Sequence, residues 1–235
     1  MAIQIQGAGG SIVEAGAFAA EGLHVVLKPQ DYGALGHYRA VLTTGTIAAG
    51  MGALGELVQM RWVNATQFCL IFEVAILEFY NVATAWTSGR FLFDVIRSTA
   101  WSVDGTGGNV VSVADPQLQL RAATMGASLF STGFRLATTA ALGAGTKTLD
   151  TLPMGATYGR VDAVAVKHHI PQSNVVATAS PAAGPGIELM HPDIGAGEHP
   201  LVLAVNEGIS IRATVPATGT WAASFLVKWA ELAAF

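Results

Sequence analysis

The fold of this chain is decided by residues 209–229, which read ISIRATVPATGTWAASFLVKW. Isoleucines alternate with polar residues in the first part, and aromatic residues share one face of the second part. Alternation with a period of two is typical of a strand that buries one face. Residues 216–220 resemble a turn, so we predict a C-terminal hairpin. Its expected core residues are Ile209, Ile211, Trp221, Phe225 and Trp229.

The same alternation recurs through the middle of the chain, around residues 58–62, 68–74, 91–96 and 117–121. Glycine-containing turns separate these segments. Many short strands with frequent turn signals predict an all-β fold, either a jelly roll or a β-sandwich, with long loops. Helix is indicated only weakly, over residues 14–21 and 48–57.

The composition is poor in charge and rich in small apolar residues. Charged residues make up 12% of the chain, against about a quarter in a typical soluble protein. We therefore expect much of the surface to be buried against other copies of the chain. The alternative is a monomer with a surface of small residues. No uncharged apolar run reaches the length of about 20 residues that a membrane-spanning helix needs.

The distribution of charge argues against nucleic acid as a partner. The formal net charge is −4, and the 12 lysines and arginines are scattered along the chain. Nucleic-acid binding requires basic residues gathered on one surface.

We expect one large domain with two appendages. Residues 1–22 form a Gly/Ala-rich N-terminal arm without Lys or Arg, which lacks the pattern of a signal peptide and so favours synthesis in a cytoplasm. Residues 23–235 form a single sandwich or jelly-roll domain. Residues 171–200 carry five prolines and form a Pro-rich insertion in it.

Two glycine-rich motifs suggest nucleotide binding, but their context does not support it. Residues 50–55 match the G-x-G-x-x-G pattern, with Glu73 near the usual distance. That pattern works at the start of a helix, whereas the residues that follow here alternate like a strand. Residues 143–148 lack the Gly-Lys-Ser/Thr order of a phosphate loop and are interpreted as a turn. We therefore expect no cofactor.

The histidines do not form a convincing metal site. His168 and His169 are adjacent, so on a strand they would point to opposite faces. His191, Asp193 and His199 lie close together in the Pro-rich insertion, where an interface loop is favoured over a metal site. Together with the lack of a nucleophile motif, this predicts a protein that is not an enzyme and binds no metal.

The remaining candidates are Cys69, Trp86 and Trp101. Cys69 is the single cysteine, which excludes an internal disulfide, and its apolar neighbours predict a core position. Trp86 and Trp101 lie near turns. We expect them, with His191 and His199, to contribute to an interface; a sugar-binding surface is the alternative for the tryptophans.

The C-terminal stretch from residue 200 onward resembles virion structural proteins of tailed bacteriophages. The resemblance rests on residues 200–208, 211–221 and 228–231, and on the shorter stretches 42–50 and 145–150. It covers about a third of the chain and includes no catalytic motif.

The resemblance implies a capsid- or tail-associated protein without a cofactor. The favoured expectation is a capsid decoration protein, a homotrimer that binds the major capsid protein or other virion proteins after synthesis in the host cytoplasm. The alternative is a receptor- or carbohydrate-binding module of a tail fibre or spike. A third class, a depolymerase, would require two carboxylates facing each other in a cleft.

Overall fold

The computed structural model describes residues 4–6, 12–14, 36–48, 50–114, 126–130, 132–161, 187–193 and 198–233. These ranges contain strands and no helix, so none of their segments is a helix that could cross a membrane. The strands are β1 (Gln4–Gln6), β2 (Ile12–Glu14), β3 (Gly36–Thr43), β4 (Ile47–Ala48), β5 (Met51–Trp62), β6 (Phe68–Asn81), β7 (Gly89–Val103), β8 (Asn109–Val110), β9 (Phe134–Leu136), β10 (Thr146–Leu149), β11 (Gly155–Val161), β12 (Ile187–Met190), β13 (Leu201–Leu203), β14 (Glu207–Val215) and β15 (Thr220–Leu232).

The chain divides into two compact units, Met1–Asp31 and Tyr32–Phe235. In the first unit, β1 and β2 pair antiparallel, with Ile5 opposite Val13. This short hairpin lies within the predicted N-terminal arm, whose other residues lie outside the described ranges.

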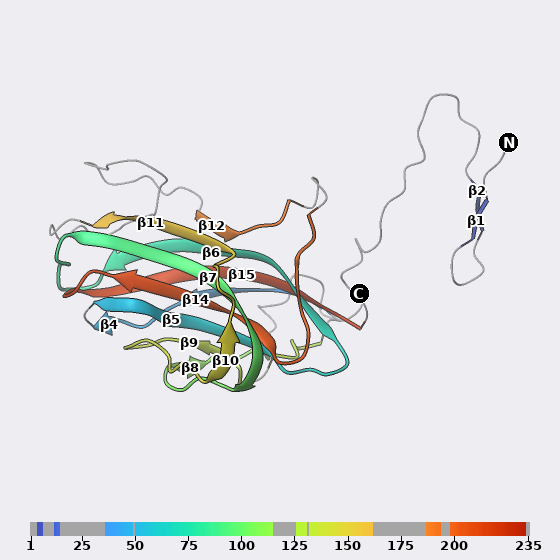
Figure 1. The fold of residues 1–235 in the computed structure, drawn as a ribbon, viewed down its shortest axis with the longest axis horizontal. Coiled ribbons are helices and arrows are strands. Elements are labelled where there is room, and N and C mark those ends of the chain that lie inside the picture. Colours follow the sequence, from blue (N-terminus) through green and yellow to red (C-terminus); the bar gives the residue numbers. More distant parts are fainter. Residues whose placement is uncertain are drawn as a thin grey trace, which may run out of the picture. The chain divides into compact units, whose positions relative to one another are not determined.

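The second unit is a β-sandwich, which confirms the predicted all-β class (Figure 1). Among the described residues, one sheet has seven strands in the order β10-β7-β14-β5-β9-β8, with β11 also paired to β7. The other has six strands in the order β12-β6-β15-β3, with β13 paired to β6 and β4 paired to β15. All of these pairings are antiparallel.

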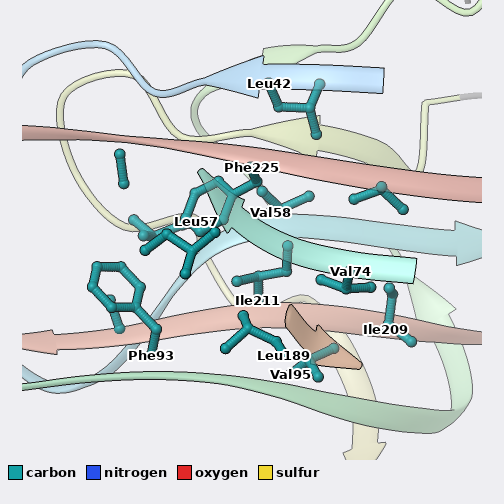
Figure 2. Packing of buried hydrophobic residues seen from close by; sticks show 14 of the residues in the cluster. Leu42, Leu57, Val58, Val74, Phe93, Val95, Leu189, Ile209, Ile211 and Phe225 are labelled. Carbon is teal, nitrogen blue, oxygen red and sulfur yellow. The ribbon is translucent and has the colours of Figure 1, made fainter. Parts of the chain in front are cut away.

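The core lies between the two sheets, where alternate residues of facing strands meet (Figure 2). Phe225 of β15 meets Phe93 of β7 with ring centroids 6.2 Å apart. Trp229 stacks on Tyr38 of β3 and meets the ring of Phe134 edge-on. Aromatic pairs in such geometries add about 0.5–1.5 kcal/mol each beyond the area they bury. Cys69 is completely buried in this core, as predicted.

The predicted C-terminal hairpin is wrong, although its five core residues are all buried. β14 pairs with β5 and β7, whereas β15 pairs with β3, β4 and β6, so the two strands belong to opposite sheets. Residues 216–219 therefore cross from one sheet to the other, and Thr220 already belongs to β15. A link this short can join strands in either way, and the alternation within each strand does not specify its partner.

One further expectation needs correction. Residues 48–57 do not form a helix, because Met51 begins the long strand β5. The Pro-rich insertion 171–200 contains a strand, β12, in antiparallel register with β6. Its residues 171–186 and 194–197, and most of the proposed helix 14–21, lie outside the described residues.

Candidate functional site

A polar cluster is buried on the outer face of the seven-stranded sheet. In β14, Ile209 and Ile211 point into the sandwich core, so the alternating Ser210 and Arg212 point to the outer face. Ser210 is nevertheless fully buried, and Arg212 is 9% exposed. Gln59 lies directly opposite Ser210 on β5 and is fully buried as well. Buried polar groups of this kind are costly unless they are paired.

The curvature of β7 places a further strand over this face. Ala100 has φ of 48° and is exposed, which marks an irregularity in β7, and the strand curves strongly near its carboxyl end (Figure 1). The partner strand β10 pairs with this end, in a register that shifts between Thr146 and Thr148. Lys147, between them, is thereby directed at the outer face of β5.

Glu56 is the centre of the cluster. Its Oε2 atom accepts hydrogen bonds from Lys147 Nζ, from Gln59 Nε2 at 2.5 Å and from Ser210 Oγ at 3.0 Å. The Lys147 side chain is 2% exposed and that of Glu56 is 7% exposed. The carboxylate therefore gathers side chains from three strands.

A second ion pair lies beside the first. The Arg212 guanidinium donates to both carboxylate oxygens of Asp94, from Nε at 2.8 Å and from Nη2 at 2.6 Å. Such bidentate pairs fix the orientation of both side chains. The formal charges of the two pairs cancel, which allows them to be buried together.

Lys147 has an unusual environment for a lysine. Burial lowers its pKa below the ordinary value, and the positive charge of Arg212 acts in the same direction, while Glu56 opposes this change. The Nζ atom lies 4.0 Å from the ring centroid of Trp101, an arrangement that stabilises the ammonium form. The arrangement holds an amine, a carboxylate and a carboxamide in one dry cluster.

Another buried carboxylate, Glu231, lies at the end of β15. It accepts hydrogen bonds from Ser128 Oγ at 2.5 Å, from the Leu129 backbone N–H at 3.1 Å and from Trp229 Nε1 at 3.2 Å. Burial raises the pKa of Glu231 even though these hydrogen bonds oppose the change. Glu231 thus attaches the segment 126–130 to the sandwich.

Trp86 and Trp101 do not lie on the surface. They are 1% and 0% exposed, so the prediction that they anchor an interface or a sugar-binding surface is wrong. Trp86 packs on Phe79 with ring centroids 4.6 Å apart, and Trp101 lies beneath Lys147. Trp86 follows the bend at residues 82–84 and Trp101 precedes the loop after β7, but both rings are buried against the sheets.

The two histidines of the predicted interface are exposed. His191 Nδ1 lies 2.9 Å from Glu188 Oε1, and its side chain is 48% exposed. His199 is exposed too, and its Nδ1 lies 2.9 Å from the Pro200 carbonyl oxygen. Their contribution to an interface stays a prediction. No three His, Cys, Asp or Glu side chains are grouped as metal ligands within the described ranges, which omit His168 and His169.

Neither glycine motif has the surroundings of a nucleotide site. Residues 51–55 are themselves the first part of strand β5, where a dinucleotide site would need a helix. Gly143 and Gly145 lie in the irregular segment before β10, and Gly145 has φ of +69°. Residues 146–148, predicted as part of a turn, belong to β10 instead. Lys147, which follows these glycines in β10, was not among the predicted site residues, yet its side chain enters the buried cluster.

Comparisons with protein-family models, with curated proteins and with solved structures give no match to this chain. The function must therefore be inferred from the fold and its surface.

Proposed function

We propose that this chain is a non-enzymatic structural protein of a phage particle that assembles with copies of itself and decorates the capsid. The observation that carries the proposal is an open sheet edge in a chain of unusually low charge. β3 is the last strand of the six-stranded sheet, and within the described residues it pairs only with β15.

The edge formed by β3 is suited to pairing with another chain. It is a regular strand of eight residues, and Val41 is 62% exposed on it. Long regular edge strands are templates for association, and natural proteins commonly protect them with charge, proline or bulges. Here Arg39 is the one charged residue of the strand.

The order of the strands supports a jelly roll. The strands β3-β15-β6-β12 form most of one sheet and β5-β14-β7-β11 most of the other. β14 lies between β5 and β7, and β15 lies between β3 and β6 in the opposite sheet. Double-sheet jelly rolls of eight strands occur in viral capsid proteins and in lectins. This is an analogy at the level of the fold and supports a virion role by association.

A decoration protein of this kind would act through many simultaneous contacts. Each contact of an oligomer with the shell can be weak, because joining several binding sites raises the overall affinity steeply. The alternative role in sugar binding loses its two candidate residues, since Trp86 and Trp101 are buried.

Light scattering of the purified protein tests self-assembly. We expect a multiple of 24.3 kDa, with three copies favoured. Val41→Lys places a charge on the β3 edge and should shift the protein toward the monomer. Leu152→Lys is the matched control, because Leu152 is 76% exposed in the link between β10 and β11 and should leave the oligomer intact. A monomeric wild type at micromolar concentration would contradict the proposal.

The location in the particle requires a separate experiment. Immunogold labelling of purified phage particles that carry this gene should decorate the head at regular intervals. Labelling confined to the tail would support the receptor-binding alternative, and unlabelled particles would refute a virion role.

A further inference from the structure

The buried cluster around Glu56 contains the components of a covalent cross-link. We propose that Lys147 and Gln59 become joined by an amide bond between Nζ and Cδ, with Glu56 carrying the proton. The bond would be intramolecular and would connect β10 with β5.

Lys147 and Gln59 both donate hydrogen bonds to one oxygen atom of Glu56. Glu56 Oε2 accepts a hydrogen bond from Lys147 Nζ and another from Gln59 Nε2, at 2.5 Å. The amine and the carboxamide therefore lie next to each other on the same carboxylate oxygen. All three side chains are more than nine-tenths buried, so their positions are set by packing.

The orientation of the Gln59 carboxamide is fixed by its neighbours. Its nitrogen faces two acceptors, Glu56 Oε2 and the Gly143 carbonyl oxygen at 2.9 Å, so a flipped amide would place oxygen against oxygen. Its Oε1 atom is buried without a hydrogen-bond partner. A Cβ atom on Gly105 would lie 2.2 Å from Oε1, so only glycine fits at that position. The nitrogen that would leave is thus next to the group that can protonate it.

The reaction balances without any further reactant. Glu56 takes a proton from the Lys147 ammonium, and the neutral amine attacks Cδ of Gln59. The Nζ–Cδ bond forms, Nζ loses a second proton to Glu56, the Cδ–Nε2 bond breaks, and Nε2 receives both protons through Glu56 and leaves as ammonium. Glu56 is again a carboxylate at the end, as expected of a general acid–base group.

The surroundings favour this chemistry over an ordinary salt bridge. Burial lowers the pKa of Lys147, which increases the share of the neutral amine that can act as a nucleophile. The ring of Trp101 covers Nζ at 4.0 Å, and water is largely excluded from the side chains. Proximity in a fixed geometry is itself a large part of catalysis for such a step.

Intact-mass spectrometry of the full chain tests the proposal. The main species should be about 17 Da lighter than the sequence mass, the mass of one ammonia. Trypsin should then leave residues 40–61 joined to residues 136–160, uncut at Lys147. Tandem fragmentation should place the bond between Gln59 and Lys147.

Three variants serve as controls. Lys147→Arg and Gln59→Met should each show the full sequence mass, because one lacks the nucleophile and the other the carboxamide. Glu56→Gln should also remain unlinked. Processing of the N-terminus would change the masses of this variant and of the wild type equally, so the difference between the two masses, corrected for the substitution, reports the link alone. A wild type at the full sequence mass, with unlinked peptides, would overturn the proposal. A loss of about 18 Da, with Lys147 joined to Glu56, would overturn the assignment of Gln59.

Discussion

Replacing Phe225 with alanine tests the packing between the two sheets most directly. Phe225 is fully buried on β15 and faces Phe93 of the opposite sheet. Removal of a buried phenylalanine side chain costs about 3–5 kcal/mol, because apolar burial is lost and a cavity is left. A typical domain is stable by only about 5–15 kcal/mol, so Phe225→Ala should lose a large share of the total.

The neighbouring residue provides the control. Leu226 lies next to Phe225 but points to the outer face of the sheet, where it is half-buried opposite Val41. Leu226→Ala should therefore cost about 1 kcal/mol. Urea denaturation followed by tryptophan fluorescence measures both changes, since all five tryptophans are in the described residues and Trp221 and Trp229 flank the site. Phe225→Leu extends the series if the alanine variant does not fold.

An exchange of effects between the two variants would contradict this packing of β15. A stable Phe225→Ala together with an unfolded Leu226→Ala would mean that the register of β15 is shifted by one residue, which would exchange its two faces. Equal and small effects would mean that β15 is not a core strand.

Two further predictions concern a buried acid and a close contact. Because the pKa of Glu231 is raised, the folded state keeps a proton that the unfolded state loses above about pH 4. The stability of the fold should therefore fall as pH rises through the raised pKa. Glu231→Gln should flatten this fall in urea midpoints measured from about pH 4 to 8. An unchanged slope would argue against a buried ionisable Glu231. Gly155→Ala should destabilise the protein by about 3 kcal/mol or more, because its Cβ would lie 1.5 Å from the Leu189 carbonyl oxygen. Gly107→Ala is the control, because a Cβ atom there meets no atom within 4 Å and only the φ of +78° is unfavourable, which should cost about 1–2 kcal/mol in thermal unfolding. Equal losses of stability in the Gly155 and Gly107 variants would contradict the close approach of β11 to β12.

The strands and the core could be predicted because their signal is local. Alternation in residues 209–215 and 221–229 reflects which face each side chain takes, and this depends only on the geometry of a strand. The pairing could not be predicted in the same way. β14 is central in its sheet and is buried on both faces, yet its outward Ser210 and Arg212 look like residues of a solvated face.

The buried cluster was missed because its members are distant in sequence. Lys147 and Glu56 are 91 residues apart, and each looks like an ordinary surface residue in its own segment. The same cause explains the error at Trp101, since its burial depends on β10 lying over the bend in β7. Only the tertiary arrangement converts a turn lysine and a tryptophan near a loop into an interior pair.

The position of the cluster suggests why such a link would suit the structural role proposed above. In the sheet order, β7 and β14 separate β10 from β5, so a bond between Lys147 and Gln59 spans both strands on the outer face. It would close a loop of about 88 residues, for which the chain-entropy relation used for disulfides gives about 4–5 kcal/mol of stabilisation. The salt bridge alone contributes less, because the desolvation of two buried charges offsets most of their attraction. A covalent bond also persists when strand hydrogen bonds are strained. The seven-stranded sheet could then resist separation, while β3, which pairs only with β15 in the described part of the chain, stays available for the proposed assembly.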